Sequence, residues 1–125
     1  MSLQHPLARA KGLGSAKDGT GHWWSLRLTS IALALLTPWF VVFAIRVAGA
    51  DAGTAAAAVA RPLTATLLAT FVLAMFLHVQ QGLQVVIEDY VHGAAGLALQ
   101  VLVKFVCIVS VVASLLAIGR LVFAA

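Results

Sequence analysis

A polar cluster interrupts an otherwise apolar stretch, and it holds the residue types that could do chemistry. The run HVQQGLQVVIEDY extends from His78 to Tyr90 and carries three glutamines within six residues of the histidine. An unpartnered polar group in an apolar environment costs on the order of several kcal/mol. We therefore expect each member of the cluster to point toward protein or a ligand.

Helical spacing divides this stretch into two candidate sites. At about 100° per residue, Gly82 lies about 40° around from His78, and Asp89 lies about 20° around if the helix persists. Tyr90 would then lie about 18 Å from His78 along the helix axis. Gly82 removes a side chain beside the imidazole, which gives clearance to a flat macrocycle or to a closely packed helix.

Two interpretations of His78 are open at this point. The imidazole is an axial ligand of a b-type haem held between helices, or it hydrogen-bonds a neighbouring helix through the glutamines. Haem iron in such a site commonly takes two histidines. The other histidines are all predicted outside the hydrocarbon core, so a second ligand would have to come from another chain; they are His5, His22 and His92.

Three further residues carry candidate roles. The Tyr90 phenol could donate a hydrogen bond to a quinone carbonyl, and the Asp89 carboxylate could relay protons. The ordinary alternatives are an interfacial tyrosine and a solvated aspartate. Arg27 opens the first apolar segment and could pair with haem propionates, or it could anchor the chain to lipid headgroups.

The composition predicts that a membrane scaffold positions these residues. The chain has 125 residues, of which 62% are hydrophobic and 10% are charged, whereas soluble domains are about a quarter charged. The net charge of +4 would suggest nucleic acid in a soluble protein. Here the basic residues lie between apolar runs, so lipid headgroups and membrane topology account for them, and no nucleic-acid partner is expected.

Three apolar segments predict an all-α integral membrane protein with transmembrane helices at about 27–47, 63–88 and 97–123. With lysine and arginine side chains reaching toward the headgroups, each is long enough for a hydrocarbon core of about 30 Å. We expect residues 27–125 to form the membrane anchor and residues 1–26 to form a polar cytoplasmic segment.

The connections and the charge distribution predict the topology. Pro38 should kink the first helix, and residues 47–62 should form either a surface helix or an early start of the second span. Five lysines and arginines fall on the side of the N-terminus and three on the other side. This bias predicts that the N-terminus and the second link face the cytoplasm.

The chain resembles the membrane-anchor D subunit of bacterial succinate dehydrogenase (succinate:quinone oxidoreductase, respiratory complex II). The resemblance covers all three predicted spans. Its motif is a histidine, a glycine four residues later and an Asp-Tyr pair at eleven and twelve residues, which His78, Gly82, Asp89 and Tyr90 match. Arg27 before TSIALAL and the segment GHWWSLR are similar to the family as well.

The resemblance implies one haem b held between this chain and a second, C-type anchor subunit. His78 would be the axial ligand of the haem iron on this side, with Gly82 beside the ring and Arg27 near the propionates. Tyr90 would bind ubiquinone, with Asp89 adjacent. An iron–sulfur subunit and a flavoprotein subunit would dock at the bacterial inner membrane, and the flavoprotein would oxidise succinate, since this chain has no succinate-oxidising site.

Other functions share these features. The chain could be the anchor of a quinol:fumarate reductase, a haem-free anchor, or a small membrane subunit without redox work. The sequence leaves open the direction of electron flow, the quinone species, the second haem ligand, the role of His22 and any higher oligomer of the heterotetramer.

Overall fold

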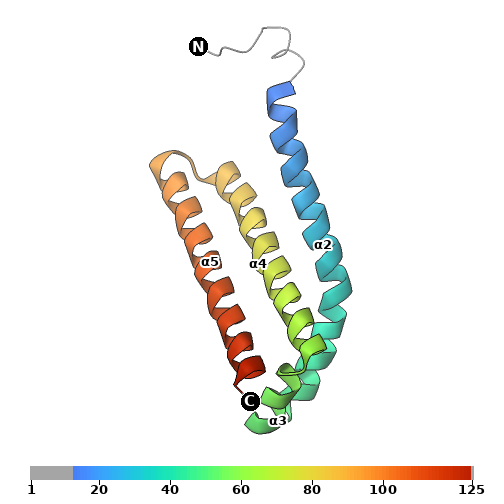
Figure 1. Ribbon diagram of the computed structural model, residues 1–125. Helices are drawn as coiled ribbons and strands as arrows, with labels where there is room; N and C mark the ends of the chain where they lie inside the picture. The colour runs from blue at the N-terminus through green and yellow to red at the C-terminus, as the bar shows by residue number, and fades with distance from the viewer. Residues whose placement is uncertain (1–12, 125) are drawn as a thin grey trace.

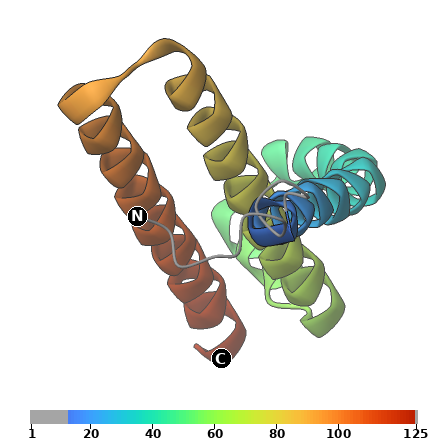
Figure 2. The same ribbon diagram turned by 90° about the horizontal axis from the view of Figure 1, so that it is seen from above.

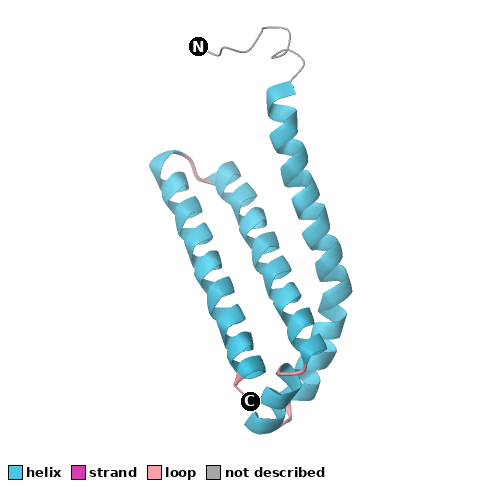
Figure 3. Cartoon of the chain, in the orientation of Figure 1, coloured by secondary structure: helices cyan, strands magenta, loops and turns pink. Residues whose placement is uncertain are grey.

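The protein is described by a computed structural model that covers residues 13–124, with side chains from Gly21 onward. All regular structure in this range is helical, with α2 at Leu13–Ala48, α3 at Ala52–Val59, α4 at Pro62–Tyr90 and α5 at Gly93–Phe123 (Figures 1 and 3). Of the expected polar segment at residues 1–26, residues 1–12 lie outside the described part, and the chain is helical from Leu13. The all-α prediction is confirmed for the described residues.

Three of these helices are long and apolar enough to cross a membrane. They comprise Gly21–Ala48 within α2, with 28 residues, and the whole of α4 and α5, with 29 and 31 residues. At about 1.5 Å per residue, each exceeds the roughly 30 Å hydrocarbon core. The helices must therefore tilt or protrude into the headgroup layers. The three-helix membrane fold expected from the sequence is confirmed.

Helix α4 is the centre of the molecule. It packs against α2 on one side and α5 on the other, while the described parts of α2 and α5 make no contact with each other (Figure 2). Among the side chains described from Gly21 onward, the buried apolar ones all belong to α4, and the Phe71 ring stacks on Phe40 of α2 with centroids 4.4 Å apart. Most other large apolar side chains are exposed, which leaves wide surfaces for lipid or other subunits.

A separate short helix, α3, connects α2 to α4. Asp51 caps its N-terminus, accepting bonds from the Thr54 amide at 3.2 Å and the Thr54 hydroxyl at 2.6 Å. These bonds, the one from the hydroxyl above all, lower the pKa of the Asp51 carboxyl. Pro62 begins α4, where its missing N–H costs nothing. Of the two alternatives for residues 47–62, the structure has a separate helix and not an early start of α4.

The link between α4 and α5 is very short. Only Val91 and His92 lie outside helix, and Gly93 follows with a φ of +72°, a left-handed conformation that favours glycine. A Cβ at Gly96 would lie 2.6 Å from the Val91 carbonyl oxygen, so glycine is needed there too. Because of this tight turn, α5 begins at Gly93 and not near residue 97 as expected.

The ends of the helices define two sides of the molecule. Helix α2 continues through Pro38, and Figure 1 shows it bending over its lower half. Figure 1 also places the N-terminal end of α2 toward the same end of the molecule as the α4–α5 link, with α3 and the end of α5 at the opposite end. The expectation that the N-terminal end and the second link share one side is confirmed. The assignment of that side to the cytoplasm stays a prediction.

Candidate functional site

Two polar contacts join α2 to α4 among the side chains that the structure describes. The Thr29 Oγ1 atom lies 3.1 Å from His78 Nδ1, and the Gln81 Nε2 group donates to Ser25 Oγ at 2.6 Å. Ser25 and Thr29 are one turn apart on α2, and His78 and Gln81 are nearly one turn apart on α4. The contacts therefore form two adjacent layers between the same helices, and the polar side chains of His78 and Gln81 face protein as expected.

The two contacts are largely shielded. Thr29 is 6% exposed and Gln81 is 9% exposed, while His78 is half-buried. The Gln81 Oε1 atom is buried and has no hydrogen-bond partner among the described residues. Leaving such an atom unpaired costs about 1–3 kcal/mol. The layer formed by Ser25 and Gln81 therefore has unused hydrogen-bonding capacity.

The remaining side of His78 is open. No described residue hydrogen-bonds its Nε2 atom. Gly82, one turn along α4, is exposed, and a Cβ placed on it would meet nothing within 4 Å. The histidine is thus held by one ring nitrogen and has room next to it, which fits a flat ring bound through Nε2.

The other two glutamines follow a different stripe of α4. Gln80 Nε2 donates to Gln84 Oε1, and Gln84 Nε2 donates to Glu88 Oε1, both at 3.1 Å. Gln80 also lines a cavity of about 570 Å³ between α4 and α5, together with Lys104. The glutamines therefore do not connect His78 to its neighbouring helix; Thr29 makes that contact directly.

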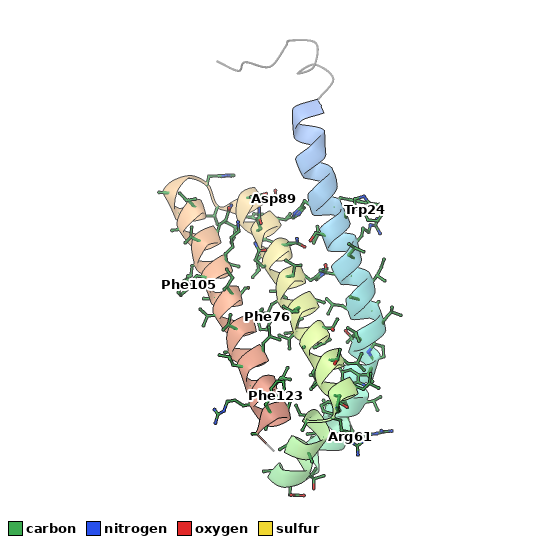
Figure 4. All side chains as sticks on the ribbon, viewed as in Figure 1. Trp24, Arg61, Phe76, Asp89, Phe105 and Phe123 are labelled. Atoms are coloured by element: carbon green, nitrogen blue, oxygen red, sulfur yellow. The ribbon has the colours of Figure 1, made fainter. Side chains whose placement is uncertain are left out.

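Asp89 and Tyr90 end α4. The helix persists through Tyr90, so the condition on which their expected positions depended is met. Both side chains are exposed, Tyr90 by 81%, and neither makes a hydrogen bond to a described residue. Figure 4 shows Asp89 toward the same end of the bundle as Trp24 on α2. An exposed phenol beside a carboxylate at a helix end can serve a ligand shared with another protein.

Arg27 lies apart from this histidine. It is exposed, and its guanidinium carbon is 5.1 Å from the centroid of the Trp23 ring, a cation–π distance. It stands two positions before Thr29, which places it about 160° around α2 from the side that contacts His78. The structure does not bring Arg27 and His78 together, and the role of Arg27 at the propionates stays a prediction.

Ser25 and Thr29 are residues of this site that the sequence pattern did not predict. A small hydroxyl side chain in a helix usually bonds its own backbone, as Thr29 also does. The signal that could have found them is their four-residue spacing, which places two hydroxyl groups on one face of the first span. That face meets the histidine and a glutamine of α4.

Comparison with known proteins identifies the family to which this chain belongs. The family model described as "Succinate dehydrogenase/Fumarate reductase transmembrane subunit" matches residues 1–117. The chain belongs to this family. The resemblance noted from the His78–Tyr90 motif is therefore confirmed at the level of the family.

Relatives within this family include two proteins named succinate dehydrogenase hydrophobic membrane anchor subunit. The one from Paracoccus denitrificans is 36% identical over 88 residues, which cover 70% of this chain and 68% of the relative. The one from Rickettsia bellii is 33% identical over 113 residues, covering 90% of each chain. No solved structure is significantly similar to the chain. The names of these relatives support the prediction of a membrane anchor. Together with the three apolar helices, they also support a multi-pass membrane protein in bacteria.

Proposed function

We propose that the chain is a haem- and quinone-binding membrane anchor of a bacterial succinate:quinone oxidoreductase. Its relatives carry the name of the succinate dehydrogenase anchor, which favours electron flow from succinate to quinone. The family also includes fumarate reductase subunits, so the anchor of a quinol:fumarate reductase is the second candidate.

One observation of the structure carries the haem assignment. His78 is held through Nδ1 by Thr29, while Nε2 is free of described partners and Gly82 leaves open space one turn away. This is half of a two-ligand site. The other half is expected from the C-type anchor subunit, because His22 lies seven residues before Thr29 on α2 and His92 lies beyond the end of α4.

Each residue of the site has a distinct task in this proposal. His78 would hold haem b at the iron, and the haem supplies a one-electron store between the iron–sulfur subunit and quinone. Gly82 keeps the ring face clear, and Arg27 would reach the propionates only from the far face of α2. At the end of α4, Tyr90 would donate a hydrogen bond to a ubiquinone carbonyl, and Asp89 would hold or pass a proton.

The docking surface follows from the same layout. Tyr90 and Asp89 lie on the side of the molecule that carries the N-terminal end of α2, which the distribution of lysine and arginine assigns to the cytoplasm. The iron–sulfur and flavoprotein subunits would dock on this side. The exposed apolar helix faces would receive the second anchor subunit and lipid.

Replacing His78 tests the haem assignment. The His78→Gln substitution keeps a polar side chain near Thr29 but removes the imidazole ligand, so we expect the reduced b-type absorption band of the purified complex to be lost or shifted. Succinate oxidation with an artificial acceptor should be retained, because it occurs on the flavoprotein. His92→Gln, at an exposed helix cap, is the matched control. An unchanged haem spectrum in His78→Gln would remove His78 from the site.

A further inference from the structure

The hydrogen bonds around Thr29 bear on which group of this contact carries the shared hydrogen. The Thr29 hydroxyl has a single hydrogen, and two backbone carbonyl oxygens of its own helix lie within reach, Ser25 O at 2.9 Å and Leu26 O at 3.0 Å. His78 Nδ1 lies 3.1 Å from the same hydroxyl oxygen. With the hydrogen directed to the carbonyls, a lone pair of the oxygen is left facing Nδ1.

We infer that Thr29 is a positioning residue that holds His78 as the Nδ1–H tautomer and so makes Nε2 the ligand atom. This inference rests on the proposed haem-binding function and deepens it. The Nδ1–H group donates to Thr29, and Nε2 keeps its lone pair for iron. The opposite arrangement, with the hydroxyl donating to Nδ1, would put the proton on Nε2 and close it to a metal.

The contact is built to hold one ring orientation. Thr29 is 6% exposed, and bonding to its own backbone restricts its rotamer. The adjacent bond from Gln81 to Ser25, at 2.6 Å, keeps α2 and α4 in register one turn away. The imidazole is therefore oriented by packed and hydrogen-bonded neighbours before any ligand arrives, which lowers the entropy lost on binding.

The hydrogen bond also tunes the ligand. An acceptor at Nδ1–H increases the electron density of the imidazole and the basicity of Nε2. A more basic ligand stabilises ferric over ferrous iron, so the bond should lower the midpoint potential of the haem. Loss of such an outer partner typically weakens metal binding about 10- to 100-fold. Removal of the hydroxyl should thus weaken haem retention and raise the potential.

The test compares two substitutions at Thr29 in the intact complex. Thr29→Val keeps the shape of the side chain and removes the hydroxyl, whereas Thr29→Ser keeps the hydroxyl. Thr66→Val is the matched control, since the Thr66 hydroxyl bonds only the Pro62 carbonyl of its own helix, at 2.7 Å, on an exposed site. The readouts are haem content per complex, the reduced spectrum and the midpoint potential.

We expect Thr29→Val to lose haem at least about tenfold faster on dilution and to show a higher midpoint potential. Thr29→Ser and Thr66→Val should match the parent. If Thr29→Val assembles with an unchanged spectrum, potential and haem content while His78→Gln loses the haem band, the positioning role is wrong and the haem assignment stands. If neither Thr29→Val nor His78→Gln changes the haem, both the positioning role and the assignment of His78 as haem ligand are wrong.

Discussion

At the scale of single residues, the two interpretations of His78 turn out to be compatible. The sequence left open whether His78 is a haem ligand or makes a structural contact. The imidazole has two ring nitrogens, so one can make the contact while the other binds iron. Nδ1 contacts Thr29, and Nε2 is free of described partners. The spacing of His78 and Gly82 on one face was readable from the sequence. The threonine partner was not, because it depends on which face of α2 meets α4.

Tyr90 carries the prediction that bears most directly on quinone. Tyr90→Phe removes one hydroxyl from a side chain that is 81% exposed, so the fold should not change. Loss of a neutral hydrogen bond worth about 1 kcal/mol should lower kcat/KM for quinone about fivefold.

Steady-state quinone reduction by the complex measures this effect, with succinate oxidation by an artificial acceptor as the internal control. Normal quinone kinetics in Tyr90→Phe would take the phenol out of the quinone site.

At the scale of elements, α4 holds every buried apolar side chain among the described residues, and it contributes His78 and Gln81 to the polar contacts with α2. The existence of the three long helices followed from apolar runs of sufficient length. Their ends did not, because those depend on local backbone chemistry: the left-handed Gly93 starts α5 four residues before the expected position. Likewise, the Asp51 cap makes α3 a helix of its own.

The layer of Ser25 and Gln81 predicts a measurable contribution to helix packing. Ser25→Ala removes the acceptor of the 2.6 Å bond from Gln81 and leaves a second buried amide atom unpaired. Interhelical hydrogen bonds in membranes contribute about 0.6 kcal/mol on average, with a maximum near 1.7 kcal/mol. We expect a destabilisation in this range in detergent-induced unfolding of the complex.

Ser30→Ala is the control, since the Ser30 hydroxyl is exposed and bonds only the Leu26 carbonyl of its own helix. Equal stability of the two variants would contradict a role for Ser25 in joining α2 to α4.

The α4–α5 turn predicts a different response at two glycines. Gly96→Ala would place a methyl group 2.6 Å from the Val91 carbonyl oxygen, and the backbone must shift to accept it. Such overpacking typically costs about 1–3 kcal/mol. Gly119→Ala meets nothing within 4 Å and should be neutral or stabilising, because alanine is the better helix former. Thermal unfolding of both variants checks this, and a Gly96→Ala complex as stable as the parent would rule out the tight turn.

At the scale of the whole molecule, the described chain is a row of three helices with exposed apolar faces. The low share of charged residues and the high apolar content were enough to predict a membrane protein. Three consecutive spans place the start of α2 and the α4–α5 link at one end of the helices, and α3 and the end of α5 at the other. One sequence was enough to predict the candidate residues on α4, but not the residues of α2 that contact them. Under the proposed function, the open space beside Gly82 and the exposed Tyr90 would face haem, quinone and the partner subunits.

The central claim is that this chain forms one wall of a haem and quinone site shared with partner subunits. Purification of the tagged chain from its own bacterial membrane, with identification of the bound proteins and a reduced-minus-oxidised spectrum, tests it directly. The account predicts a flavoprotein, an iron–sulfur protein and a second small membrane anchor in equal amounts, with a b-type haem band. A chain that purifies without these subunits and without a haem band would contradict it.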